Sequence, residues 1–168
     1  MRKFSASLLA ISFFMLILCA CNKVTEPVTL NTQFVSKAVI VTDEITMNAE
    51  ITVCGGDDVS ITLLSPESLK GLNYHKVNST LYIEYNGLKC TTADDYLTSY
   101  NPFEVIFDVL SSLSNAQLKI IGEKSESEVA YKGKTANGEY TLYADKMSGK
   151  IQKIVPSFTD CEITFSYE

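Results

Sequence analysis

Hydrophobic and polar residues alternate with a period of two along most of the chain from Phe34 onward. In the clearest run, the residues that share one face are Ile45, Met47, Ala49, Ile51 and Val53, and those between them are Thr46, Asn48, Glu50, Thr52 and Cys54. This alternation predicts a half-buried antiparallel strand. Gly55-Gly56-Asp57-Asp58 then predicts a turn, after which Val59, Ile61 and Leu63 resume the pattern. The two runs together predict a β-hairpin.

Further strands are expected at Phe34–Val41, Leu72–Val77, Leu81–Tyr85, Gln117–Ile121, Glu128–Lys132, Glu139–Ala144, Lys150–Val155 and Glu162–Tyr167. Asn137-Gly138 and Ser148-Gly149 predict tight turns between neighbouring strands. About ten strands joined by short connections predict a mainly β fold built as a meander.

One segment has the spacing of a helix. Asn101 suits the N-cap, Pro102 the first helical position and Glu104 the third. An apolar face with a 3.6-residue period follows, made of Phe103, Ile106, Phe107, Leu110 and Leu113. An amphipathic helix of this kind either fills the core on the concave side of a curved sheet or acts as a movable plug over a lipid pocket.

The first residues have the pattern of an export signal. Met1-Arg2-Lys3 is positively charged, and the apolar run from Phe4 to Leu18 is about 15 residues long, shorter than the roughly 20 that span a bilayer. We therefore expect a cleaved secretory signal and not a permanent transmembrane helix.

Composition and charge exclude several classes of protein. The chain has 168 residues, 46% of them apolar, which is typical of one ordinary domain. Removal of residues 1–20 takes away Arg2 and Lys3 but no acid, so the formal charge changes from −6 to −8 and no arginine remains. Because arginine is the preferred bidentate reader of phosphate, we expect no binding of nucleotides or nucleic acid.

The junction Leu18-Cys19-Ala20-Cys21 resembles the bacterial lipoprotein box. The resemblance implies cleavage after Ala20 and attachment of a diacylglycerol thioether to Cys21, which then anchors the protein to the membrane. Asn22 takes the place of the Asp that would retain a lipoprotein at an inner membrane. The lipoprotein box thus implies an extracytoplasmic location. Together with Asn22, it implies the outer membrane in a two-membrane cell and the outer leaflet in a one-membrane cell.

The expected organisation is a signal peptide (1–20), a lipidated cysteine with its tether (21–31) and a single β-rich domain (32–168). Asn22 to Asn31 is polar, contains Pro27 and has no period. Fully extended at roughly 3.3 Å per residue, these ten residues would reach about 33 Å from the bilayer.

Two further patterns are similar to the LolA/LolB-like lipoproteins, including germination lipoproteins of spore-forming bacteria. They are the connection from Ser65 to Leu72 and the hairpin Tyr143-Ala144-Asp145-Lys146-Met147-Ser148-Gly149-Lys150-Ile151. The resemblance implies a half-barrel that encloses a hydrophobic cavity covered by helices. This chain departs from that pattern because it offers one convincing helix, so we expect an open antiparallel half-barrel with that helix, at about 102–113, on its concave face. In the type members it implies binding of acyl chains, such as palmitate, and in the germination lipoproteins partnership with another envelope protein.

No set of residues predicts catalysis, a metal site or a cofactor. Cys54, Cys90 and Cys161 would remain after lipidation, as one disulfide of unknown pairing plus a thiol or as three thiols, and their spacing does not fit zinc. His75 is the only histidine, and we expect it on a strand surface. The doublets Asp43-Glu44, Asp57-Asp58 and Asp94-Asp95 lack the spacing of a calcium loop and read as solvated turns. The sequence therefore indicates a protein that is not an enzyme.

Two functions stay open. The first is a membrane-anchored envelope protein that binds or supports a partner protein, with Phe34–Val41 as an edge strand for strand addition or for exchange in a homodimer. The second is a lipoprotein receptor or localisation factor that binds a lipid or acyl chain in a hydrophobic cavity. The residues expected to line that cavity are Val53, Ile61, Ile83, Phe103, Ile106, Phe107 and Leu110. The tyrosines near the helix and the following hairpin suit either a pocket mouth or an interface, but strand-edge packing is their expected use: Tyr96, Tyr100, Tyr131, Tyr140 and Tyr143.

Overall fold

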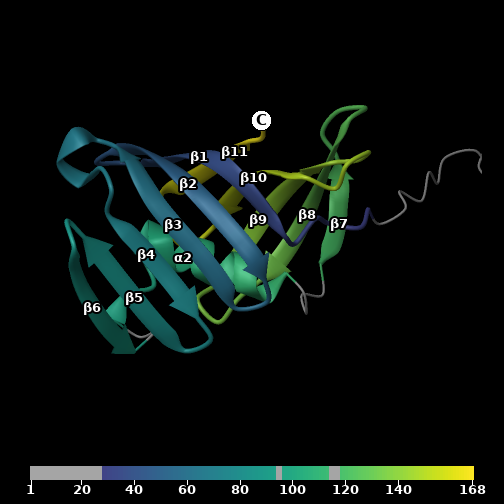
Figure 1. Ribbon diagram of the computed structural model, residues 1–168. Coiled ribbons are helices and arrows are strands. Elements are labelled where there is room, and N and C mark those ends of the chain that lie inside the picture. Colours follow the sequence, from purple (N-terminus) through teal and green to yellow (C-terminus); the bar gives the residue numbers. More distant parts are fainter. Residues whose placement is uncertain (1–27, 94–95, 114–117) are drawn as a thin grey trace, which may run out of the picture.

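The computed structural model describes residues 28–93, 96–113 and 118–168, and it forms one open antiparallel sheet of eleven strands (Figure 1). The predicted signal peptide and Cys21 lie outside the described residues. In the order of the sheet the strands run β6-β5-β4-β3-β2-β1-β11-β10-β9-β8-β7. The predicted half-barrel fold is confirmed, and the described residues contain one α-helix.

Two meanders build this sheet. The first consists of β1 (Phe34–Thr42), β2 (Thr46–Gly55), β3 (Asp58–Ser65), β4 (Asn73–Val77), β5 (Thr80–Tyr85) and β6 (Leu88–Ala93), with a short 3₁₀ turn, η1 (Glu67–Leu69), between β3 and β4. The second consists of β7 (Lys119–Glu123), β8 (Glu128–Lys134), β9 (Glu139–Asp145), β10 (Ile151–Pro156) and β11 (Cys161–Ser166).

The two meanders join where β1 pairs with β11, with Lys37 opposite Ser166 and Thr42 opposite Cys161. Strand β1 is therefore central, and among the described strands the edges are β6 and β7. The prediction that Phe34–Val41 is an edge strand is wrong. The alternation along β1 indicates only which of its side chains are buried. It cannot indicate that β11, far away in the sequence, pairs with the other edge of β1.

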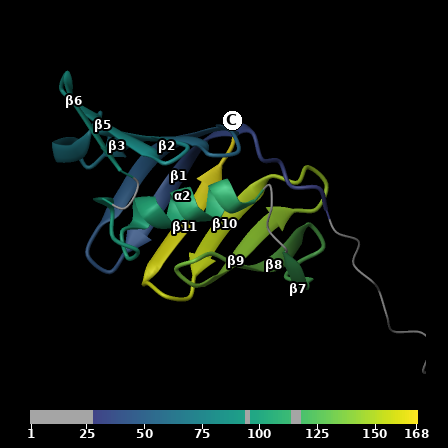
Figure 2. The same ribbon diagram turned by 90° about the horizontal axis from the view of Figure 1, so that it is seen from below.

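The helix α2 (Pro102–Ser112) lies inside the curve of the sheet (Figure 2). Asn101 caps it, because the side-chain oxygen accepts a hydrogen bond from the backbone N–H of Phe103 at 2.9 Å. The described residues contain no helix that is both long and apolar enough to cross a bilayer. The apolar face of the helix thus packs in the core, as its amphipathic spacing predicts.

Alternation decides which face of each strand enters the core. On β2, Met47, Ala49, Ile51 and Val53 are at most 4% exposed, whereas Ile45, which begins the predicted pattern, is 37% exposed. Strand β6 was missed from the sequence. Its residues Leu88, Lys89, Cys90 and Thr91 are all exposed, so it has no apolar period to reveal it.

Candidate functional site

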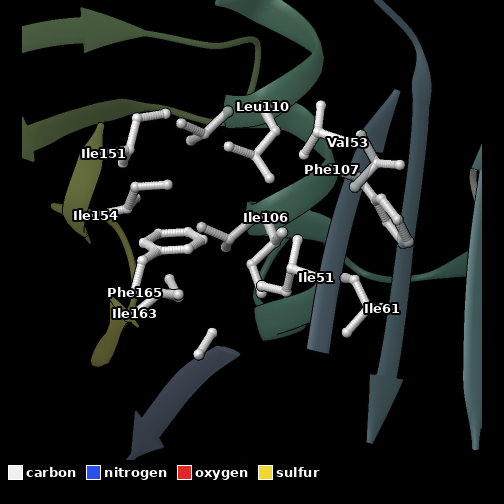
Figure 3. Close-up of a cluster of buried hydrophobic side chains, with 14 of the residues drawn as sticks. Ile51, Val53, Ile61, Ile106, Phe107, Leu110, Ile151, Ile154, Ile163 and Phe165 are labelled. Carbon is white, nitrogen blue, oxygen red and sulfur yellow. The ribbon is translucent and has the colours of Figure 1, made fainter. Parts of the chain in front are cut away.

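The concave side of the sheet is occupied by the apolar face of α2. Phe103, Ile106, Phe107 and Leu110 are at most 6% exposed and pack into one cluster with residues of both meanders (Figure 3). Val53 and Ile61 belong to this cluster as well, and Ile83 is partly buried against it. The structure thus brings together the seven residues that the sequence assigns to the lining of a hydrophobic cavity. The four of them that belong to α2 pack against the sheet.

A pair of opposite charges fixes α2 to the sheet. Lys76 Nζ on β4 lies 3.1 Å from Glu104 Oε1 on the helix, and the two side chains are 11% and 10% exposed. The Lys76 ammonium also lies 5.6 Å from the centre of the Phe107 ring. A buried charge requires a partner, so the helix is held at one position along β4. The sequence offers one clue to this pair, because Glu104 interrupts an otherwise apolar helix start.

The three strands β4, β5 and β6 form an arm whose surface is hollowed by a groove of about 370 Å³. We call it the arm groove; its lining residues are Asn73, His75, Tyr82, Ile83, Glu84, Lys89, Cys90 and Thr91. It combines an aromatic ring, an amide and charges of both signs. Among the described strands, β6 beside it is an edge, so unpaired backbone groups adjoin the groove.

His75 contributes to the arm groove as a surface residue. Its side chain is 40% exposed, and Nε2 lies 2.9 Å from Asp58 Oδ1 at the start of β3. Its ring lies 6.1 Å from that of Tyr82, which is 44% exposed. This is the position on a strand surface that the sequence predicts for His75.

A second, polar cleft of about 330 Å³ lies where the β8–β9 turn approaches α2. Asp108 on the helix accepts a hydrogen bond from the side-chain amide of Asn137 in that turn. Lys76, at the inner end of the cleft, is already paired with Glu104. Two of the charged side chains that line the cleft, Lys76 and Asp108, are thus already engaged in contacts within the protein.

The three described cysteines are thiols in different surroundings. Cys54 and Cys90 are exposed, and Cys161 is buried on β11. Burial, together with the nearby charge of Glu162, raises the pKa of the Cys161 thiol from 9.0 to about 11. Cys161 is thus a neutral core residue at physiological pH. No group of three or more metal-binding side chains occurs within the described ranges.

The five tyrosines near the helix and the following hairpin differ in exposure, and Tyr143 is partly buried. Tyr131 and Tyr140 are at most 2% exposed, and burial raises the pKa of Tyr140. Tyr96 and Tyr100, in the segment that leads to α2, are 63% and 70% exposed. The buried pair therefore packs in the sheet, while the exposed pair lies on the surface ahead of the helix.

Part of the predicted tether contacts the domain. Asn31 donates its backbone N–H to the carbonyl of Gly149 at 2.9 Å, and Val28 donates to the Tyr131 hydroxyl at 3.0 Å. Val28 and Leu30 also pack against the core. Residues 28–31, which the sequence assigns to the tether, thus contact the domain.

No protein-family model matches the sequence, and no curated protein matches it. Among solved structures, the chain is similar to a LolA superfamily protein from Nitrosomonas europaea, with 7% identity and a TM-score of 0.44 over 80% of this chain and 84% of that one. It is also similar to a chain in the structure of the CwlD amidase from Clostridioides difficile in complex with the GerS lipoprotein. There the identity is 15% and the TM-score 0.47, over 81% of this chain and 85% of that one.

A third similarity is to a putative outer membrane lipoprotein-sorting protein domain from Vibrio parahaemolyticus, with 10% identity and a TM-score of 0.40 over 79% and 82% of the two chains. One of these three structures is described as a LolA superfamily protein, the family that the sequence resembles. At such values the similarity concerns the fold, so the function is argued from this chain's own residues.

Proposed function

We propose that this protein is a membrane-anchored, non-enzymatic lipoprotein of the cell envelope that acts as a protein-interaction module. The observation that carries the proposal is the occupied concave face. The apolar residues of α2 fill the space that a lipid carrier would keep for an acyl chain, and the buried pair of Lys76 and Glu104 holds the helix there. Recognition is therefore left to the outer surfaces.

The anchor rests on the lipobox Leu18-Cys19-Ala20-Cys21. Cys21 carries a diacylglycerol, and two or more acyl chains anchor a protein stably where a single chain does not. Asn22 after it favours the outer membrane in a cell with two membranes. A Cys21→Ala variant, compared with wild type by membrane fractionation and by intact mass, tests this step.

The arm groove and edge strand β6 form the proposed contact for an envelope protein. Tyrosine is enriched at protein interfaces, and Tyr82 is 44% exposed at the centre of the arm. The outer edge of β6 pairs with no other described strand, so an extended segment of the partner can add a strand there while the groove receives one of its side chains. We therefore propose strand addition at β6, and not at β1 as the sequence suggests.

Photo-crosslinking in the cells that make this protein tests the proposed interface. Benzoylphenylalanine replaces Tyr82 in one variant and Val39 in the control, because Val39 is 38% exposed on the central strand β1, away from the arm. We expect a discrete protein adduct at position 82 and none at position 39. Equal adducts at both positions, or none at either, would contradict the interface.

Binding of a lipid or acyl chain, as in a lipoprotein receptor or localisation factor, would require α2 to leave the concave face. Native mass spectrometry of the full chain, extracted gently from membranes and compared with a denatured sample, separates the two functions. We expect no lipid beyond that attached to Cys21. A lipid that remains bound in the native sample and is lost on denaturation would instead rank the cavity function first.

A further inference from the structure

The turn between β9 and β10 holds an apolar side chain out into solvent. Met147 at its tip is 95% exposed. Asp145 Oδ1 fixes the turn by accepting the backbone N–H groups of Met147 and Ser148 at 3.1 and 2.7 Å. The neighbouring β7–β8 turn supports it, since Lys146 donates its backbone N–H to the Ser127 carbonyl at 2.9 Å. The exposure of Met147 is thus built into an ordered turn.

The N-terminal segment reaches the domain at this same turn. Asn31 donates to the Gly149 carbonyl, and Gly149 has a φ of 66° with no room for a side chain, because a Cβ there would lie 2.1 Å from the Thr29 carbonyl oxygen. Only six residues, 22–27, separate Cys21 from the described part of the chain. At most about 3.3 to 3.6 Å per residue, they span roughly 20 Å. A membrane anchor at Cys21 would keep the Met147 turn close to the bilayer.

Charges around the turn are mixed. Lys146 Nζ pairs with Glu123 at 2.9 Å, and Lys124 and Lys150 lie over the rings of Tyr143 and Tyr167. Negative charge comes from Glu126, between β7 and β8, and from Glu128 and Asp145, which lie opposite each other on β8 and β9. Such a surface has no strong preference for anionic headgroups, so an apolar side chain is its best means of contact with lipid.

We propose that the β9–β10 turn is a second membrane contact, with Met147 inserted into the interfacial region of the bilayer that holds the lipid anchor. The inference rests on the proposed lipid attachment at Cys21. One side chain suffices because the anchor holds the turn at high effective concentration beside the membrane. Two points of contact fix the orientation of the domain. Figure 1 places this turn and the β4–β6 arm on opposite sides of the molecule, so the arm groove is presented away from the membrane.

Tryptophan fluorescence tests this contact directly, because the natural sequence contains no tryptophan. Met147→Trp is made in the full chain, with Leu88→Trp as the matched control, since Leu88 is 77% exposed on the far arm. Each lipidated protein is purified from a bacterial host and reconstituted into phosphatidylcholine vesicles with and without brominated acyl chains. We expect the emission of the Met147→Trp variant to shift to the blue and to be quenched by brominated lipid. The emission of the Leu88→Trp variant should remain unchanged.

The outcomes separate the contact from the anchor. If both variants float with the vesicles and neither tryptophan is quenched, the Met147 contact is overturned and the anchor stands. Equal quenching at both positions overturns the fixed orientation, and with it the inference. If the intact mass of wild type shows no attached lipid and neither wild type nor Cys21→Ala floats, the anchor itself is wrong and the second contact fails with it.

Discussion

Lys76 and Glu104 place two charges inside an otherwise apolar core. Removal of one partner from a buried ion pair leaves the other charge uncompensated, whereas replacement of both by apolar residues is often neutral. The pair therefore contributes little net stability but makes other positions of α2 along β4 unfavourable. Its role at the residue scale is to specify where the helix lies.

The first prediction concerns this pair. Glu104→Gln should lower the free energy of unfolding by about 3 kcal/mol, because Lys76 remains buried without its carboxylate. Lys76→Met combined with Glu104→Met should cost much less than Glu104→Gln alone. Urea denaturation of wild type and both variants measures the difference. Equal losses in the two variants would contradict a specific role for the pair.

Cys161 gives a prediction about alkaline pH. Its pKa is raised to about 11 in the folded protein, so the folded thiol keeps its proton above pH 9 while the unfolded thiol ionises. The stability of the fold should therefore fall between pH 9 and 11, by about 2 kcal/mol from this group. Urea unfolding measured across this pH range gives the dependence of the unfolding free energy on pH. In Cys161→Ala the part of that dependence due to the thiol should disappear. Cys54→Ala is the control for loss of an exposed thiol and should keep the wild-type slope.

At the scale of elements, α2 begins where its sequence signals place it. Asn101, Pro102 and the spacing from Phe103 to Leu110 predict both its start and its buried face. The strands with one core-facing side were predictable for the same reason. Strand β6 was not, because Leu88-Lys89-Cys90-Thr91 is exposed and has no alternation to detect. The arm groove could not be predicted either, since it depends on that strand.

The cap of α2 can be tested by itself. Asn101→Ala removes the acceptor for the Phe103 N–H and should cost about 1 kcal/mol of stability. Asn101→Asp keeps an oxygen in the same place and should cost little. Thermal unfolding followed by circular dichroism compares the two variants. A loss in Asn101→Asp as large as that in Asn101→Ala would show that the side-chain oxygen is not what matters.

The whole molecule depends on one pairing between distant parts of the chain. The other neighbouring strands of the described sheet follow one another in sequence, but β1 pairs with β11, and Ser166 bonds back to Lys37 across 129 residues. Local patterns predict each strand and the turns between them. They contain no information on which two ends of the meanders meet, so they predict β1 as an edge strand.

Truncation tests how much the fold depends on β11. A chain that ends at Asp160 loses Cys161, Ile163 and Phe165, which are at most 6% exposed in the core. We expect it to show no cooperative thermal transition. Removal of Glu168 alone, which takes away only an exposed pair with Lys37, should leave the transition in place. A cooperative transition in the shorter chain would mean that the first meander folds without its partner strand.

The pairing of β1 with β11 also affects when the protein can fold during its synthesis. The first strand to be synthesised finds its second neighbour only when the last strand has been made, and contacts at such long separation form slowly. A nascent chain of this design therefore lacks the pairing of β1 with β11 until β11 has been synthesised. If the predicted export signal is used, this delay provides an interval in which the polypeptide can be passed through a membrane before it folds.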